Sequence, residues 1–170
     1  VVGKGYSYGS GPGSTSPAYS GAAYGGQTNA SLKTYGSITQ PINLGSGGYG
    51  YPYAWSSIGG GAVKLNVSGT LTNNGIITAD DYGSGSGGSI WITTNTLSGT
   101  TGSIKSNGFN SIYSNTYCGG AGGRIALYYT TKNYTGSTTA YGQSSYGSAA
   151  GTIYEKPASQ TYGNLTIDNN

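Results

Sequence analysis

The chain has 170 residues, of which 34 are glycine and 18 are tyrosine, and its net charge is +3 with 6% charged residues. Ordinary globular domains contain about 25% charged residues, and only 34% of this chain is hydrophobic, so a thick leucine-rich core is excluded. The scattered positive charges do not form the basic stripe that nucleic-acid binding needs. Frequent Val, Ile, Thr and Tyr favour strands, and no segment has the apolar periodicity of an amphipathic helix.

The first 57 residues are rich in glycine, serine and tyrosine and contain few strand-like stretches. One piece, LKTYGSI (residues 32–38), has the composition of a short strand. Pro41 and Pro52 limit the sequence around them to sheet edges or loops. We expect residues 1–57 to pack on, or to cap, a repetitive unit formed by residues 58–170.

Residues 58–167 alternate short apolar stretches with small and polar residues, which is the pattern of half-buried strands. Eight strands are predicted from this alternation. In chain order they are Val63–Val67, Gly75–Thr78, Ser89–Thr93, Ser103–Ser106, Arg124–Tyr128, Ser137–Tyr141, Thr152–Glu155 and Asn164–Ile167.

Glycine-rich corners recur before every second predicted strand. Their last glycines, Gly61, Gly88, Gly123 and Gly151, follow one another at steps of 27, 35 and 28 residues. A second set of glycines, at positions 75, 102, 136 and 163, has steps of 27, 34 and 27. A phosphate-binding loop occurs once and precedes a helix, whereas these corners repeat and precede strands, so the spacing indicates a repeat architecture.

The two matching periods predict an all-β fold, a parallel β-solenoid (β-helix) with coils of about 27 to 34 residues. Equivalent strands of successive coils would then pair in parallel. One inward row would contain Val63, Leu65, Val67, Ile90, Ile92, Ile125, Leu127 and Ile153, and the second face would contain Ile77, Ile104, Thr138 and Leu165. Glycine at the corners would permit positive φ. An antiparallel β-sandwich or jelly roll is the alternative, because it also has short strands and frequent turns.

Few residues of the chain could support catalysis. With no histidine and one cysteine, neither the usual serine-hydrolase triad nor a zinc site can form. The adjacent Asp80 and Asp81 would point to opposite sides of an extended chain, which is unsuitable for a catalytic pair. In a loop they are weak candidates for calcium binding together with backbone carbonyls. We therefore expect no enzyme activity, no metal site beyond this candidate and no cofactor.

Two types of modification are suggested by single residues. Asn29 and Asn133 begin N-x-S/T sequences in expected loops and are the better candidates for glycosylation, while Asn66 and Asn164 lie in predicted strands. Cys118 has no second cysteine in the chain, so it is either a small buried residue or a thiol available for an intermolecular bond.

The stretches GGGAVKLNVSGTLTNNGIITADDYGSGSGGSIWITT (residues 59–94) and GGAGGRIALYY (residues 119–129) carry a family resemblance. They resemble glycine-rich β-helical repeat segments of large secreted and cell-surface proteins, exoproteins and adhesins, of bacteria and archaea. The resemblance covers nearly the whole chain and rests on repetition without a catalytic motif. It implies an extracellular, structural or adhesive role, either as an excised segment of a longer protein or as a self-assembling one.

These observations together predict a structural subunit of an extracellular filament or cell-surface assembly. The open ends of a solenoid expose strand edges that can pair with another copy, so the expected interface residues are Val1, Val2, Tyr162, Leu165 and Ile167. The tyrosines suit either subunit contacts or sugar stacking. The alternative is an adhesin or carbohydrate-binding module with surface glycans as partners; neither nucleic acid nor a membrane span is expected.

Overall fold

The computed structural model describes residues 1–14, 21–28, 33–49, 57–109, 119–143 and 147–169. Within these ranges the chain is all-β and contains no helix. Its strands, in chain order, are β1 (Ala62–Thr72), β2 (Ile76–Thr78), β3 (Ser89–Gly99), β4 (Ser103–Lys105), β5 (Arg124–Tyr134), β6 (Ser137–Thr139), β7 (Thr152–Pro157) and β8 (Asn164–Thr166). Each of the eight predicted strands overlaps one of these.

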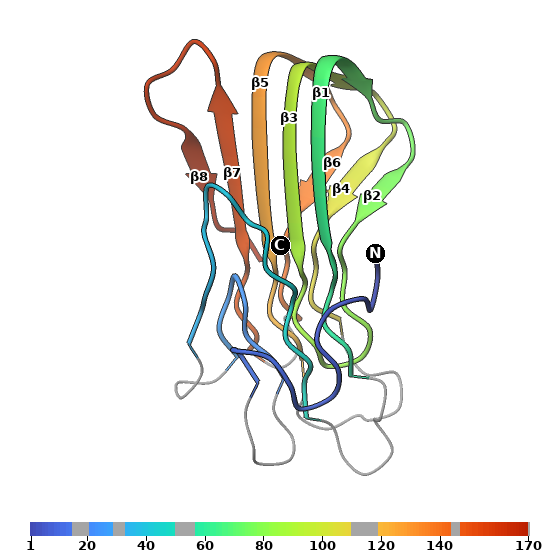
Figure 1. Cartoon of the computed structure of the whole chain (residues 1–170), viewed down its shortest axis with the longest axis vertical. Helices are drawn as coiled ribbons and strands as arrows, with labels where there is room; N and C mark the ends of the chain where they lie inside the picture. The colour runs from blue at the N-terminus through green and yellow to red at the C-terminus, as the bar shows by residue number, and fades with distance from the viewer. Residues whose placement is uncertain (15–20, 29–32, 50–56, 110–118, 144–146, 170) are drawn as a thin grey trace.

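The larger sheet has the strand order β1-β3-β5-β7-β8, and its first four strands are parallel (Figure 1). Residues opposite one another are 27, 35 and 28 positions apart, as in the row formed by Val63, Ile90, Ile125 and Ile153. These separations equal the steps between the corner glycines. The prediction that equivalent strands of successive repeats pair in parallel is therefore confirmed.

Three of these strands are longer than predicted, with eleven residues each in β1, β3 and β5. The second halves of these strands contain mostly Thr, Ser, Asn and Tyr, so the alternation of apolar and polar residues that predicts a strand is weak there. The parallel ladder continues through them because backbone hydrogen bonds do not depend on side-chain polarity. In β1 the register shifts between Val67 and Thr70, and the hydroxyl of Thr94 donates a hydrogen bond to the Gly69 carbonyl oxygen there (2.9 Å).

The smaller sheet contains β2, β4 and β6, also in parallel, and its central row is Ile77, Ile104 and Thr138, as predicted. Figure 1 shows these three strands behind β1, β3 and β5, to which they are joined by turns at the same end. The buried core lies between the two sheets. It is formed by Ala79, Ile90, Ile92, Leu97, Ile104, Ile125, Leu127, Tyr134, Ala140 and Ile153.

The prediction that Leu165 extends the second face is wrong. β8 pairs antiparallel with β7, so Leu165 lies opposite Tyr154 in the larger sheet and is 49% exposed. The reason is the early end of β7 at Pro157, which has no N–H for a ladder. The Ala158 N–H then donates to the Tyr129 carbonyl oxygen (2.7 Å), and the chain turns back beside β7.

The glycine-rich corners are extended segments that hydrogen-bond in three directions. The N–H groups of Ser86, Gly87 and Gly88 donate in turn to the carbonyl oxygens of Ser46, Ala121 and Ala79, each at 2.8–3.0 Å. A β-strand directs successive N–H groups to two opposite sides, whereas three directions correspond to the three residues per turn of a polyproline II chain. The corners therefore form a bundle beneath the strands.

Glycine is needed in this bundle for close approach. A Cβ added to Gly60 would lie 1.9 Å from the Ala79 carbonyl oxygen, which real structures do not tolerate. The positive φ that glycine permits is not used at the last glycine of any corner, because none of Gly61, Gly88, Gly123 and Gly151 is in that region.

The described part of the N-terminal segment is integrated into the same bundle. Gly45 N–H donates to the Gly60 carbonyl oxygen (2.8 Å), and Gly25 N–H donates to that of Gly122 (3.0 Å). Residues 33–38 of the predicted strand LKTYGSI do not form a strand, and residue 32 lies outside the described ranges. Tyr24 is fully buried, and its hydroxyl shares a 2.6 Å hydrogen bond with that of Ser89 in β3.

Candidate functional site

The predicted interface residues are exposed at the two ends of the stacked repeats. Val1 and Val2 are 46% and 44% exposed, and Ile76 of β2, at the same end, is 67% exposed. At the other end, Tyr162, Leu165 and Ile167 are 83%, 49% and 64% exposed. Sequence reasoning missed Ile76, because Ile77 was predicted as the inward residue of that strand and its apolar neighbour was not considered as an exposed contact.

The first repeat also has unpaired strand edges. Among the strands that the structure describes, β1 pairs with β3 alone and β2 pairs with β4 alone. The Val1 ammonium donates to the Thr78 carbonyl oxygen (2.8 Å), and the Gly61 N–H donates to the Val1 carbonyl oxygen (2.9 Å). The terminus thus covers the corner below both strands and leaves their outer edges uncovered by any described strand.

The calcium candidates Asp80 and Asp81 have different environments. Asp80 accepts a hydrogen bond from the Asn107 N–H (2.7 Å) and pairs with Lys105 at 3.5 Å. Asp81 is 3% exposed, and neither carboxyl oxygen has a partner at normal hydrogen-bond geometry, although the nearby backbone N–H groups of Phe109 and Gly85 offset part of the effect of burial. Burial, followed by the charge of Asp80, raises the pKa of Asp81 well above its usual value. No group of three or more acidic, cysteine or histidine side chains that could hold a metal occurs among the described residues, and calcium binding stays a prediction.

We expect the Asp81→Asn variant to be more stable than the wild type at neutral pH. A carboxyl whose pKa is raised by folding binds more protons in the folded state, so its contribution to stability is lost as pH rises from about 4, the ordinary pKa, to the folded value. Asparagine does not ionise, so the stability of the variant does not fall in this way as pH rises. Urea denaturation at several pH values checks this, and a constant difference between the two proteins from pH 4 to pH 8 would contradict it.

The predicted modification residues have mixed outcomes. Asn133 does not lie in a loop as expected: it is an exposed residue within β5, because that strand continues to Tyr134. Asn66 and Asn164 lie in strands as expected, and both are exposed. Asn29 and Cys118 lie outside the described residues.

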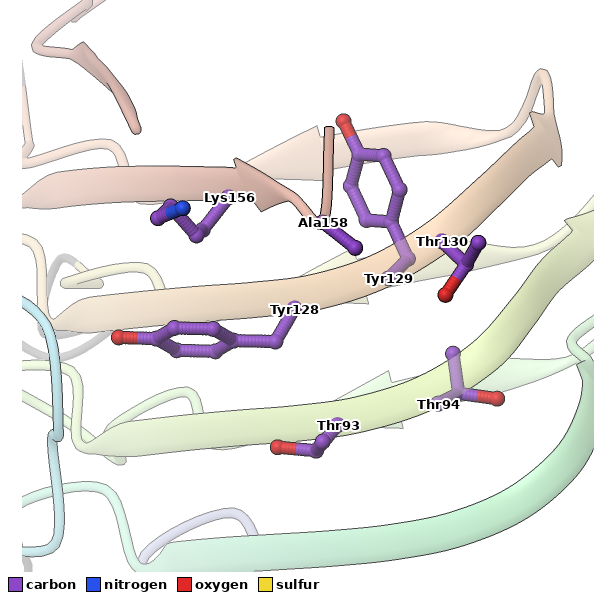
Figure 2. Close-up of a pocket in the computed structure, with 7 residues that line it drawn as sticks. All are labelled: Thr93, Thr94, Tyr128, Tyr129, Thr130, Lys156 and Ala158. Carbon is purple, nitrogen blue, oxygen red and sulfur yellow. The ribbon is translucent and has the colours of Figure 1, made fainter. Parts of the chain in front are cut away.

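A shallow groove of about 280 Å³ lies on the larger sheet (Figure 2). Figure 2 shows Thr93 and Tyr128 extending from neighbouring strands to one side of the sheet, while Tyr129 extends to the other. Thr93, Tyr128 and Lys156 belong to one register row across β3, β5 and β7. The groove is lined by Thr93, Thr94, Tyr128, Tyr129, Thr130, Lys156 and Ala158.

Beside the groove, three aromatic residues are placed around Ala126, which is fully buried: Trp91 and Tyr154 lie opposite it in the register, and Tyr128 is two residues further along β5. The ring centroid of Tyr128 lies 6.4 Å from that of Trp91 and 5.9 Å from that of Tyr154. The Lys64 ammonium lies 3.7 Å from the centroid of the Trp91 ring. We call the set Lys64, Trp91, Tyr128, Tyr154 and Lys156 the outer strip.

The N-terminal segment forms one border of the outer strip. The Tyr128 hydroxyl donates to the Thr39 carbonyl oxygen (2.7 Å), and the Arg124 Nε–H donates to the Tyr35 carbonyl oxygen (2.9 Å). Arg124 is 4% exposed, and burial lowers its pKa. It therefore fixes the segment to the sheet and is not available to a ligand.

Sequence reasoning missed the outer strip, although a signal was present. Lys64, Trp91 and Tyr154 each stand three residues after a corner glycine, and Tyr128 and Lys156 stand five residues after one. Because the corners are in register, equal offsets place these side chains in two neighbouring rows on one face.

Comparisons with known proteins found no relative of the chain. No protein-family model, no curated protein and no solved structure matches the chain. A search of the described residues for a helix able to cross a lipid bilayer finds none. The strand edges, the exposed ends and the outer strip are therefore the basis for assigning a function.

Proposed function

We propose that the chain is a β-solenoid and a structural subunit of an extracellular filament or cell-surface assembly. The observation that carries this proposal is a pair of strand edges at one end that no described strand covers, β1 in the larger sheet and β2 in the smaller. Unpaired edges are templates for further strand pairing. The parallel register of four successive repeats supports a solenoid over a sandwich, since a stack of repeats can be extended by another one.

The contact that we propose joins unlike ends of two copies. One end presents β1, β2 and the side chain of Ile76, and the other presents β8 with Leu165 and the outer edge of β6. A contact between different surfaces that does not close into a ring produces a filament. The Ala62–Val67 part of β1 is regular, and the register shift lies beyond it, so this part is the edge available for pairing.

The proposal assigns the protein to the outside of the cell and gives it no catalytic role. Low charge and abundant glycine, threonine and tyrosine suit a scaffold held by backbone hydrogen bonds. An adhesin with a saccharide site is the second candidate, and the observation that favours it is the outer strip.

We expect lysine at either end to abolish assembly, because a buried unpaired charge opposes association. In electron microscopy and light scattering, the wild type should form filaments, whereas Ile76→Lys and Leu165→Lys should each be monomeric. An equimolar mixture should stop at dimers, because each variant keeps one intact end and the two ends left over both carry lysine. Asn95→Lys, at an exposed position within β3, is the control and should assemble normally.

Thermal unfolding of the monomeric variants separates lost assembly from lost folding, since both positions are largely exposed in the single copy. A wild type that remains monomeric at high concentration would overturn the proposal. So would filaments of either end variant alone.

A further inference from the structure

The outer strip has the arrangement of a binding surface in which cations flank aromatic rings. Lys64 on β1 and Lys156 on β7 are separated by three strand spacings, about 14 Å across the sheet, and Lys156 lies one outward position further along its strand. The rings of Trp91, Tyr128 and Tyr154 lie between them. Lys64 is exposed, and the other four residues are half-buried. The side chains therefore form a continuous surface across four repeats.

The charges on this face have one sign. β1, β3 and β5 contain no acidic residue, and the first acidic residue of the chain is Asp80. The acidic residue of β7, Glu155, lies opposite the inward Leu127 and pairs with Lys132 at 2.6 Å. The strands that carry the outer strip thus present lysines and no carboxylate on this face, and this favours an anionic ligand.

The groove next to the rings supplies hydroxyl groups. Thr93 and Thr130 line it together with the ring of Tyr128 and the side chain of Lys156, whose ammonium donates to the Gln160 carbonyl oxygen. A shallow surface with a few polar groups beside aromatic faces suits a ligand that has apolar faces and hydroxyl edges. Sugar rings have both.

We propose that the outer strip binds an acidic polysaccharide, one whose sugar units carry carboxylates. The rings would stack on the apolar faces of the sugars, the two lysines would pair with carboxylates, and the threonine hydroxyls would bind sugar hydroxyls. Two cations are too few for the phosphate contacts of nucleic-acid binding. This site is independent of the proposed assembly, because it lies on the face of the sheet and not at its ends.

The test is titration calorimetry of the full chain with an oligogalacturonate, with dextran of similar length as the neutral comparison. We expect binding of the oligogalacturonate alone, weakened by added salt. Lys156→Gln should weaken it up to about fivefold, as expected for one exposed ion pair. Lys105→Gln removes the same charge from the other sheet and should have no effect.

The contribution of stacking is tested at Tyr128. Tyr128→Phe and Tyr128→Leu both lose the hydrogen bond to Thr39, but the phenylalanine keeps a ring. We expect the leucine variant to bind about tenfold more weakly than the phenylalanine variant. The proposal would be overturned if the oligogalacturonate did not bind, or if polyglutamate, an acidic peptide, bound equally tightly. It would also be overturned if Tyr128→Phe and Tyr128→Leu had equal affinities, or if Lys156→Gln and Lys105→Gln lost affinity equally.

Discussion

Replacing Gly122 by alanine is expected to destabilise the protein by about 3 kcal/mol or more, although the change adds a single methyl group. The added Cβ would lie 1.9 Å from the Ala140 carbonyl oxygen and 2.4 Å from the Gly151 nitrogen. Those two atoms are hydrogen-bonded to each other at 2.7 Å, so neither can move away freely. The Gly122 carbonyl oxygen also accepts hydrogen bonds from Gly25 and Gly26 at 3.0 and 3.1 Å. A shift of the backbone would therefore disturb three chain segments.

Gly75→Ala is the matched control for this variant. Gly75 has no atom near the position of an added Cβ, and its φ is not in the left-handed region. The same substitution there should change stability little or raise it by about 0.4–1 kcal/mol, because alanine restricts the unfolded chain. Urea denaturation followed by tryptophan fluorescence measures both. Similar urea midpoints for the two variants would show that close backbone contact is not the reason why glycine occupies the corners.

The spacing of the two sets of glycines was sufficient to predict the register of the parallel strands in both sheets, up to the shift between Val67 and Thr70 in β1. A row such as Val63, Ile90 and Ile125 repeats the corner steps, because parallel strands of equivalent repeats must start from equivalent positions. The physical role of the corners was not predictable in the same way. Positive φ and close backbone approach both select glycine, and the sequence alone does not distinguish them.

The remaining differences have local causes. Leu165 fits the repeat period, but Pro157 ends β7 early and the chain returns along that strand. The outer strip was missed because its residue types differ from repeat to repeat: lysine, tryptophan, alanine and tyrosine occupy one row. The inward row of Val63, Ile90, Ile125 and Ile153 stays aliphatic because it belongs to the core, whereas an outward row is free to vary.

Truncating Leu127 is expected to cost about 2–5 kcal/mol, the usual range for a buried leucine changed to alanine. Leu127 is fully buried, and it stands between Ile92 and Glu155 in its row, with a repeat on either side. The cavity cannot be filled by a shift of one strand, because both neighbours are fixed by their own ladders. Leu127→Met keeps most of the volume and should cost less than about 1.5 kcal/mol. Equal losses in these two variants would contradict a packing explanation.

The stability cost of the same truncation at Leu65 should depend on whether the protein is assembled. Leu65 belongs to the same row, opposite Ile92, but it lies in the edge strand β1 and is partly buried. In the single copy, Leu65→Ala should therefore cost less than Leu127→Ala, since less apolar surface is withdrawn from water. If another copy covers β1, Leu65 becomes an interior residue, and the cost of its truncation should approach that of Leu127. Unfolding measured in the Ile76→Lys background and in assembled protein gives the two values. An unchanged Leu65 penalty in the assembled protein would show that β1 is not the surface that the next copy covers.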